Sequence, residues 1–232
     1  PTYQGDVWVV AERTENGLHP GTLELTGEAR RLADSLDTEV GVVLVGENVE
    51  QLSKDLIAAG ADNVYIIESP ILKKFDPWTY RKVISACIKE YSPQIVLFAA
   101  TPLGRVLAPM VSYRTGCGLT ADCTGLKIRD SSRKGQIGIL MQTRPALGGN
   151  IMATICTKDS DSQMATVRPG VMNRPEPDYS REGKIIRYQT EVTDEDISLE
   201  IISSETGGSE ANFDADVVVS GGKGTRDRDN YE

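Results

Sequence analysis

The chain has 232 residues, which is enough for one large domain or for one domain and part of another. Its hydrophobic fraction of 39% and aromatic fraction of 6% are typical of a soluble α/β protein with an aliphatic core. The net charge of −9 argues against nucleic acid as a partner, because phosphate binding needs concentrated lysine and arginine.

Membrane insertion and secretion are not indicated either. No apolar run approaches the roughly 18 residues that a membrane span needs, and the first residues lack the basic and then apolar layout of a signal peptide. Four cysteines do not suggest a disulfide scaffold in a chain of this length, so a reducing compartment is the simpler interpretation. We therefore predict a cytoplasmic protein without a membrane span.

The first hundred residues alternate between strand and helix patterns. Apolar runs typical of buried strands lie at Asp6–Ala11, Val40–Val45, Val64–Ile67 and Ile95–Ala100. Between them, apolar residues recur at helical spacing over 25–36, 49–59 and 80–91. Four βα units with short connections predict an α/β fold with a doubly wound, mostly parallel sheet and right-handed crossovers.

Individual residues mark some of the predicted helix ends. Asp76 and Pro77 are a good N-cap and first-turn pair for the third helix. Gly60 stands at a natural C-cap position for the second helix. We expect these two helices to begin and end close to these residues.

After residue 125 the pattern changes, because strand-like segments follow one another without helices between them. These segments are Gly125–Arg129, Ile137–Gln142, Asn150–Thr157 and Gln163–Val167. We expect them to be antiparallel strands that extend or complete the parallel sheet. Ile185–Val192 and Ile197–Ser203 are interpreted as a last pair of strands.

The C-terminal residues indicate the start of a second domain. Gly207 and Gly208 give flexibility to an exposed connector. Val217–Val219 is interpreted as a short buried strand, and the glycine-rich turn after it is not followed by a helix pattern. We predict a domain over 1–206, a linker over 207–214 and the truncated start of a further domain over 215–232, which should not bind a nucleotide by itself.

No residue pattern predicts a catalytic or metal-binding site. His19 is the one histidine of the sequence and lies in a predicted turn, so neither a Ser–His–Asp triad nor a histidine metal site is favoured. Cys117 and Cys123 are six residues apart in the sequence, a spacing that fits neither a zinc pair nor a CxxC redox motif. Both are interpreted as small, partly buried residues.

Two segments near the middle of the chain carry candidate ligand-binding residues. Gly104 and Arg105 follow the fourth strand, where ligands of open parallel sheets bind and where the N–H groups of a helix start favour an anion. A tight turn with a surface arginine explains them equally well. The run 116–125 is rich in small residues, and Asp122 could accept from backbone or ligand; a loop packed on its own sheet is the alternative.

The third candidate segment is TRPALGGN, residues 143–150. Arg144 lies on a strand-like stretch that should be largely buried, and a buried arginine needs a partner because it cannot lose its charge. That partner is either an internal acid or an anionic or electron-rich group outside the domain. Gly148 and Gly149 indicate a place where another backbone or a ligand approaches.

Three runs of the sequence, in order, resemble the alpha subunit of electron transfer flavoprotein. They are PLGRVLAPMVSYRTGCGLTADCTGL, QTRPALGGNIMATI and QMATVRPGVM, and the match in order and spacing covers residues 6–224. The run VVVSGGKG resembles the start of that family's FAD-binding domain. The resemblance implies an N-terminal α/β domain of the adenine-nucleotide alpha-hydrolase-like type that pairs with a similarly folded beta subunit. A separate C-terminal domain would carry FAD and swing to deliver electrons to a dehydrogenase or quinone reductase.

The resemblance also implies a nucleotide cofactor at the subunit contact. In most members the beta subunit holds AMP; in electron-bifurcating members it holds a second FAD that faces the alpha subunit and is reduced by NADH. This chain would form one wall of that site, where a positive group such as Arg105 or Arg144 would tune the potential of the flavin. The residues expected at the wall are Gly104, Arg105, Leu119, Thr120, Ala121, Asp122, Arg144, Gly148 and Gly149.

In the start of the FAD-binding domain the corresponding residues are Gly221, Gly222, Lys223 and Gly224. Lys223 departs from the arginine usual in the family, which weakens a phosphate contact there. Compared with that family, we expect the 232 residues to hold only the start of this domain, so that the chain's own FAD site should be largely missing from them. We predict a subunit that by itself is an electron carrier and that would be part of an NADH-oxidising complex in the bifurcating type. The run GCGLTADC slightly favours the bifurcating type.

Two other functions stay open at this point. A stand-alone nucleotide-binding enzyme, such as an ATP pyrophosphatase of the same superfamily, would need a phosphate loop such as SGGxDS after the first strand, and VVAERTENG contains none. A regulatory interaction domain is the third hypothesis.

Overall fold

Seven parallel strands form the central sheet in the computed structural model, which describes residues 5–14, 17–131, 136–157, 160–199, 202, 217 and 219–226. The strands are β1 (Val7–Val10), β4 (Val40–Gly46), β5 (Asn63–Glu68), β6 (Ile95–Ala99), β7 (Gly118–Cys123), β11 (Gln163–Val167) and β12 (Lys184–Arg187). They lie in the order β12-β5-β4-β1-β6-β11-β7, and each pair of neighbours is parallel. β1, β4, β6 and β11 are buried along their whole length, as strands covered on both faces must be.

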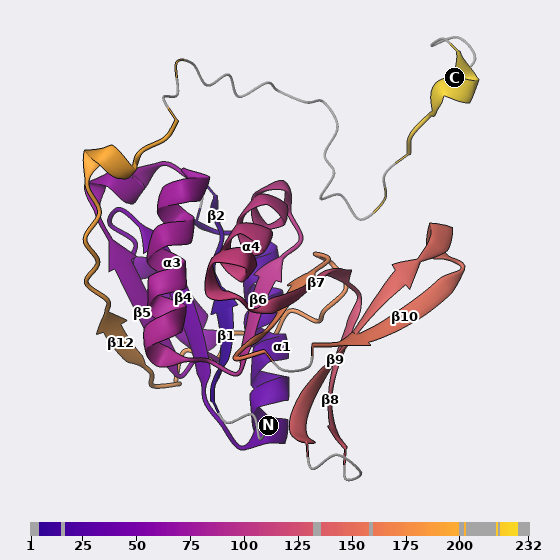
Figure 1. The fold of residues 1–232 in the computed structure, drawn as a ribbon, viewed down its shortest axis with the longest axis horizontal. Helices are drawn as coiled ribbons and strands as arrows, with labels where there is room; N and C mark the ends of the chain where they lie inside the picture. Colours follow the sequence, from indigo (N-terminus) through magenta and orange to yellow (C-terminus); the bar gives the residue numbers. More distant parts are fainter. Residues whose placement is uncertain are drawn as a thin grey trace. The chain divides into compact units, whose positions relative to one another are not determined.

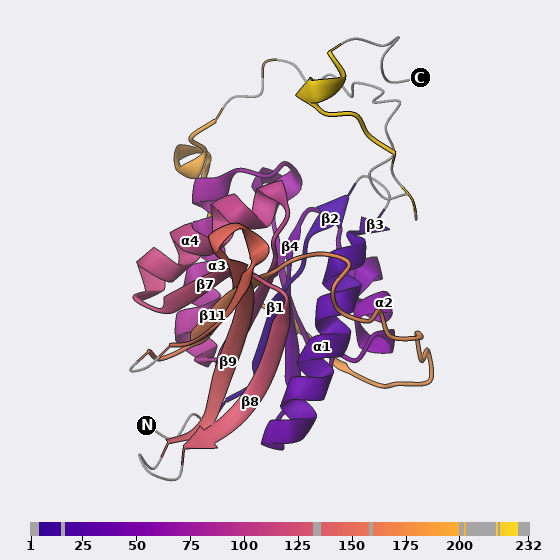
Figure 2. The ribbon, with the colours of Figure 1, turned by 90° about the vertical axis from the view of Figure 1, so that its right-hand side faces the viewer.

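Helices cover both faces of this sheet (Figures 1 and 2). α1 (Pro20–Leu36) and α2 (Ser53–Ala58) pack on the face that includes Val9 and Leu97. α3 (Pro77–Tyr91) and α4 (Pro102–Thr115) pack on the other face, which includes Trp8 and Phe98. Shorter 3₁₀ helices are η1 (Glu50–Leu52), η2 (Pro70–Lys73), η4 (Leu147–Gly149), η5 (Asp194–Asp196) and η6 (Lys223–Thr225). The predicted doubly wound α/β class is confirmed.

The long helices begin where side chains satisfy their first N–H groups. Asp76 Oδ1 accepts from the N–H of Thr79 over 2.9 Å, which confirms the predicted N-cap of α3. His19 Nδ1 accepts from the N–H of Gly21 over 3.0 Å, so the one histidine of the sequence caps α1. Gly60 follows the end of α2 with φ +124°, a conformation that favours glycine.

A second, antiparallel sheet packs beside the first. β9 (Gln136–Ala146) lies between β8 (Gly125–Ser131) and β10 (Ile151–Cys156), and β2 (Arg13–Thr14) pairs with β3 (Gly17–Leu18) in a small hairpin. The prediction that these antiparallel strands extend the parallel sheet is therefore wrong. β8 and β9 instead join the core on the α1 face, through the buried side chains of Leu126 and Leu140. Arg31 Nη2 adds a hydrogen bond from α1 to the carbonyl oxygen of Leu126 over 2.7 Å.

The prediction of an antiparallel strand at Gln163–Val167 is also wrong. This segment is β11, which runs parallel to β6 and β7 and lies between them. The chain reaches it from β6 by way of α4, β7 and the whole antiparallel sheet. A parallel neighbour needs a long crossover, and here strands supply much of it in place of a single helix.

The predicted last pair of strands is confirmed only in its first part. Within Ile185–Val192, a strand is formed by the residues of β12, which pairs with β5 in parallel. Residues 197–199 are not part of a strand. Just before them, Asp194, Glu195 and Asp196 form η5, where Asp196 Oδ2 accepts from the N–H of Thr193 over 3.0 Å. Acidic side chains favour the start of a helical turn, which explains why no strand forms here.

The chain divides into two compact units, Pro1–Leu199 and Glu200–Glu232. In the second unit, Val217 and Val219 are 78% and 81% exposed, so the interpretation of 217–219 as a buried strand is wrong for these two residues. The predicted linker over 207–214 lies outside the described residues. Across the described residues, no helix is long and apolar enough to cross a membrane.

Candidate functional site at the carboxyl edge of the sheet

β1 and β6 lie side by side, and the chain continues from them toward opposite edges of the sheet. Open α/β sheets bind ligands at such a point, beyond the carboxyl ends of the strands. Here Thr101 Oγ1 donates to Glu12 Oε2 over 2.6 Å and accepts from the N–H of Gly104 over 3.0 Å. Side chains of the chain itself therefore meet where a nucleotide phosphate would be expected.

Gly104 has a packing role in this arrangement. A Cβ at this position would lie 1.8 Å from the carbonyl oxygen of Ala99, so only glycine lets α4 approach β6 so closely. Its N–H group bonds Thr101 and is not available to an anion. Gly104 is explained without a ligand, and its cofactor contact stays a prediction.

Next to this point, Asp122 gathers two arginine side chains. Arg105 Nη2 lies 3.2 Å from Asp122 Oδ1, and Arg168 Nη2 lies 2.8 Å from Asp122 Oδ2. The hydrogen bond from Arg168 is the main cause that holds the pKa of the Asp122 carboxyl below its usual value. Asp122 itself has φ +59°, and its N–H donates to Thr166 Oγ1 over 2.8 Å, which fixes the turn at the end of β7.

Arg144 extends this group of charges from β9. Its positive charge also lowers the pKa of Asp122, and it opposes the effect of burial on Cys123. Its Nε contacts the carbonyl oxygen of Pro145 at 3.4 Å, and among the described residues it forms no ion pair. We call Arg105, Asp122, Arg144 and Arg168 the arginine cluster; it sets three guanidinium groups against one carboxylate.

The prediction that Arg144 is largely buried is wrong. Its side chain is only partly buried, because β10, the neighbouring strand, faces solvent along most of its length. The internal acid that a buried arginine would need is therefore not required here. Asp122, the acid whose pKa Arg144 influences, already bonds Arg105 and Arg168.

The remaining residues predicted on β7 do not join the cluster. Leu119 is half-buried and packs against the core on the α4 face, and Thr120 is buried with its carbonyl oxygen accepting from Cys123 Sγ. Ala121 is exposed beside Asp122. Of this run, only Asp122 converges with other candidate residues.

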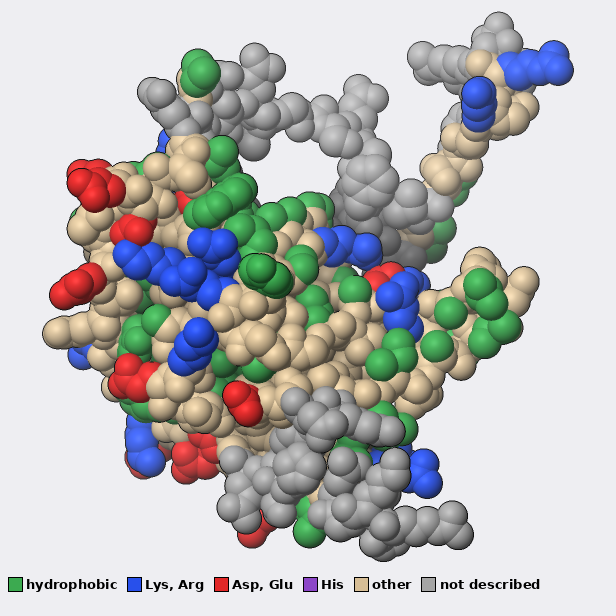
Figure 3. Space-filling view, viewed as in Figure 1, with side chains coloured by type: hydrophobic (Ala, Val, Ile, Leu, Met, Phe, Trp, Pro, Cys, Tyr) green, Lys and Arg blue, Asp and Glu red, His purple; other side chains and the backbone are tan. Residues whose placement is uncertain are grey.

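The hairpin formed by β9 and β10 carries an exposed apolar surface. We call Leu147, Ile151, Met152 and Ile155 the hairpin surface; they are 79%, 52%, 55% and 41% exposed. Figure 3 shows hydrophobic side chains along this projecting hairpin. Ile151 and Ile155 lie on the face of the hairpin that also carries Arg144, and Met152 lies on the other face, because neighbouring strand residues alternate. Exposed apolar groups on one projecting element are typical of an interaction site.

The two glycines at the tip of the hairpin are explained by their backbone conformation. Gly148 has φ +73° and Gly149 has φ +88°, which side chains rarely adopt. No described atom lies within 4 Å of a Cβ built at either position. Among the described residues, none approaches these two glycines closely, and an approach by a partner stays a prediction.

The predicted residues of the second unit form a turn by themselves. Gly221, Gly222, Lys223 and Gly224 are exposed, and the N–H of Thr225 donates to the carbonyl oxygen of Gly222 over 3.0 Å. Their part in an FAD site stays a prediction.

Cys87 and Cys123 are buried thiols without chemical activation. All four cysteines are free, and burial raises the pKa of Cys87 to about 12 and that of Cys123 to about 11, so both stay protonated. Among the described residues, no three side chains of His, Cys, Asp or Glu form a group that could hold a metal ion.

Arg168 is the member of the cluster that sequence reasoning missed. It follows β11 directly, and its N–H donates to the carbonyl oxygen of Cys123 over 2.9 Å. The interpretation of Gln163–Val167 as antiparallel would send Arg168 to the opposite edge of the sheet from Arg105. The run QMATVR does not report the direction of its strand, so no local signal in the sequence places Arg168 beside Arg105.

Comparisons with known proteins agree on one family. A family model described as electron transfer flavoprotein domain matches residues 7–192. The electron transfer flavoprotein subunit alpha of Thermoanaerobacterium thermosaccharolyticum is 46% identical over 228 residues, which cover 97% of this chain and 67% of the relative. The subunit of the same name from Megasphaera elsdenii is 40% identical over 232 residues, with 99% and 67% covered.

A relative with another name is also similar. The acryloyl-CoA reductase electron transfer subunit beta of Anaerotignum propionicum is 34% identical over 240 residues, which cover 94% of this chain and 65% of the relative. The chain thus spans about two thirds of the length of these relatives.

Proposed function

Because the chain belongs to the electron transfer flavoprotein family and matches its alpha subunits, we propose that its first unit docks the beta subunit through the hairpin surface and lines the adjoining nucleotide site with the arginine cluster. Alpha subunits of this family serve electron transfer and pair with a beta subunit. The observation that carries the proposal is that exposed apolar side chains on β10 and Arg144 on β9 belong to the same hairpin.

The hairpin surface supports the docking part. Ile151 and Met152 leave about half of their side chains in water, which is unfavourable for an isolated chain. Burial against another subunit would remove this area from water, and apolar residues of this kind form the centre of protein interfaces.

The arginine cluster supports the cofactor part. Asp122 holds Arg105 and Arg168 in place, so their guanidinium groups are positioned before a ligand arrives. Arg144 has no described carboxylate within ion-pair distance, so it is the member most available to an outside anion. These residues fit the phosphates of a bound nucleotide. They also fit the reduced flavin ring of a bound FAD, which carries negative charge in its anionic form.

FAD, when bound, accepts electrons and passes them on. The chain's own contribution would be positional: the cluster would hold positive charge beside the nucleotide, and the hairpin would exclude water from the contact. We further propose that the electrons serve a dehydrogenase or quinone reductase; the printed name of the Anaerotignum propionicum relative mentions acryloyl-CoA reductase, which supports an acyl-CoA type of partner.

A stand-alone ATP-using enzyme is the competing function. The hydrogen bond between Thr101 and Glu12 opposes it, because a carboxylate occupies the switch point of the sheet and would repel a phosphate. A purely regulatory domain would not need the arginines beside the hairpin.

The experiment combines this chain with its beta subunit and identifies the nucleotide in the complex. Bound FAD together with NADH oxidation would favour the bifurcating type, toward which GCGLTADC inclines; AMP without NADH oxidation would exclude it. The same complex tests Arg144. We expect Arg144→Gln to release nucleotide or to lower the flavin midpoint potential, because the reduced form loses a stabilising charge.

Arg114→Gln is the matched control, since Arg114 is an exposed arginine in the last turn of α4 and its loss changes the net charge equally. Equal nucleotide content and potential in both variants would remove Arg144 from the proposed site.

A further inference from the structure

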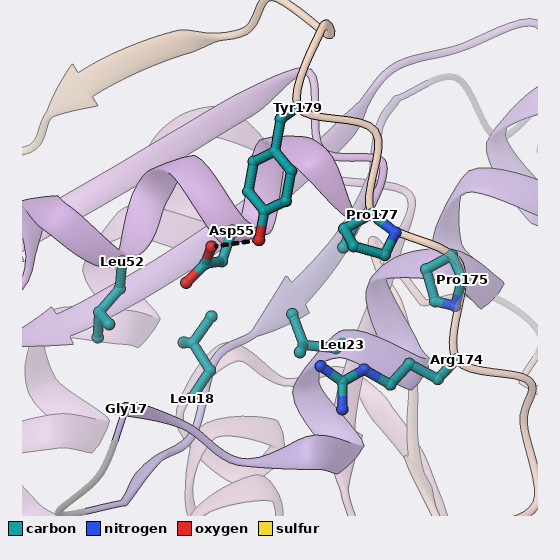
Figure 4. Close-up of a pocket in the computed structure, with 10 residues that line it drawn as sticks. Gly17, Leu18, Leu23, Leu52, Asp55, Arg174, Pro175, Pro177 and Tyr179 are labelled. Carbon is teal, nitrogen blue, oxygen red and sulfur yellow. Dashed lines mark hydrogen bonds between the residues drawn. The ribbon is translucent and has the colours of Figure 1, made fainter.

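A cavity of about 260 Å³ lies between α1, α2 and the extended segment 174–179 (Figure 4). Leu18, Leu23 and Leu52 line it from one side, and Pro175 and Pro177 line it from the other. Its volume falls just below the roughly 300–1,000 Å³ of common ligand pockets, so it suits a ligand of metabolite size. It shares no lining residue with the arginine cluster.

The wall made by the extended segment is held in place. Gly27 lets Pro175 pack onto α1, since a Cβ at Gly27 would lie 2.8 Å from Pro175 Cδ. The N–H of Asp178 donates to the carbonyl oxygen of Ala58 over 2.9 Å, and Arg181 Nη2 bonds Asp62 Oδ1 over 3.1 Å. The cavity is therefore formed before a ligand enters, which lowers the entropic cost of binding.

The acid of the lining already has a donor. Tyr179 Oη donates to Asp55 Oδ1 over 3.2 Å, as the dashed line in Figure 4 marks. This hydrogen bond raises the pKa of Tyr179, so its hydroxyl stays protonated at neutral pH and keeps donating. Lys54 Nζ lies 5.4 Å from the centre of the Tyr179 ring, which adds a cation–π contact.

The arginine of the lining has no such partner. Figure 4 shows the guanidinium of Arg174 directed toward Leu23 at the cavity rather than away from it. Within the part of the chain that the structure describes, no hydrogen bond or ion pair engages Arg174. A positive group thus stands beside a hollow of mixed lining, in which leucine and proline side chains lie next to Asp55 and Tyr179, and no described carboxylate pairs with it.

We propose that this cavity binds a small organic carboxylate with a short apolar tail. The planar guanidinium of Arg174 offers two parallel N–H groups that match the two oxygens of a carboxylate. The leucine and proline side chains remove the tail from water. Asp55 also lines the cavity and accepts from Tyr179 through Oδ1, so the ligand carboxylate has to bind on the Arg174 side, away from the Asp55 carboxylate.

The test is calorimetric titration of the 232-residue chain with hexanoate, hexanamide and inorganic phosphate. Hexanamide keeps the tail and removes the charge, whereas phosphate keeps the charge and removes the tail. We expect hexanoate to bind to one site and each of the other probes to bind about tenfold more weakly or not at all, because each lacks one of the two contacts.

Two variants place the binding in this cavity. Arg174→Gln should weaken hexanoate binding by about 10- to 100-fold, the loss expected for a hydrogen bond to a charged group. Leu52→Trp should abolish it by filling the hollow. Arg114→Gln is the control with the same loss of charge, and it should bind hexanoate as the parent chain does. Thermal unfolding of each variant checks that the fold is kept.

Any of three results would overturn the proposal: no hexanoate binding to the parent chain, phosphate or hexanamide binding as tightly as hexanoate, or equal binding by Arg174→Gln and Arg114→Gln. Because Arg174 is exposed, its substitution leaves the core intact, so the Arg174→Gln result is decisive even where Leu52→Trp fails to fold.

Discussion

The parallel sheet and the β9–β10 hairpin are both rich in apolar residues, but they use them differently. In β6 every residue is buried between α1 on one face and α3 and α4 on the other. In β10 most residues are exposed, and Ile151 and Met152 face solvent. The central strands are covered on both faces by described residues, whereas the hairpin presents apolar area that no described residue covers. An apolar strand thus marks a core only where the chain supplies both covers.

Two arginines show the same contrast. Arg13 is enclosed by its own chain: its Nε donates to the carbonyl oxygen of Val45 over 2.9 Å, and its Nη2 donates to Tyr80 Oη over 3.2 Å. A Cβ at Gly46 would lie 2.5 Å from Arg13 Cζ, so the backbone makes room for the guanidinium. Arg144 has one long contact to Pro145. The first arginine is structural, and the second is available to a partner.

Truncation of apolar side chains in the two regions gives the largest expected difference. Leu97→Ala, in β6, should lower the free energy of unfolding by about 2–5 kcal/mol, because it opens a cavity in the core. Met152→Ala, on the hairpin surface, should change it by less than about 0.5 kcal/mol in the isolated chain. Urea unfolding followed by circular dichroism measures both. Similar losses would show that the hairpin is packed within the chain, and the contrast would fail.

The second largest difference in the free energy of unfolding is expected between substitutions of Arg13 and Arg144. Arg13→Gln should cost about 1.5–3 kcal/mol of the free energy of unfolding, since it removes charged hydrogen bonds and leaves acceptors around Val45 and Tyr80 without a donor. Arg144→Gln should cost less than about 0.5 kcal/mol. The same urea titrations apply, and a larger loss for Arg144→Gln than for Arg13→Gln would make Arg144 a structural residue.

The smallest expected effect concerns the pH dependence of stability at Asp122. Its pKa is lowered in the folded chain, mainly by the hydrogen bond from Arg168, so its contribution is present above the ordinary aspartate value of about 4 and is lost as pH falls through the lowered value. Since the arginines are largely exposed, the contribution should be about 1 kcal/mol or less. Asp122→Asn should remove this part of the acid destabilisation below pH 4. Urea unfolding at a series of pH values measures the free energy of unfolding of both proteins. If this free energy changes with pH in the same way for the parent chain and for Asp122→Asn, the prediction is contradicted.

The sequence was sufficient for the elements whose residues specify their own surroundings. The apolar runs of β1, β4, β5 and β6 and the cap at Asp76 follow from local chemistry and are confirmed. The direction of β11 depends on a crossover made by distant strands, which no local pattern reports. Because of that error, Arg168 could not be placed at the same edge as Arg105.

The exposure of the hairpin could not be predicted for a different reason. Ile151, Met152 and Ile155 are apolar residues, and composition does not distinguish a surface buried by the same chain from one left for another. Gly148 and Gly149 are a similar case. A glycine is needed either where φ is positive or where a neighbouring atom leaves no room for a side chain, and the sequence does not distinguish these two reasons.

The affinity of this chain for its beta subunit tests the account most directly. Met152→Asp puts a charge on the hairpin surface, and Tyr113→Asp puts one on α4, where the side chain is 90% exposed. Analytical ultracentrifugation or calorimetry would measure the dissociation constant of each complex. We expect Met152→Asp to weaken binding by at least about tenfold, since a buried interface residue is lost, and Tyr113→Asp to leave it unchanged. Unchanged binding by Met152→Asp, or a larger loss for Tyr113→Asp, would contradict the assignment of the hairpin as the docking surface.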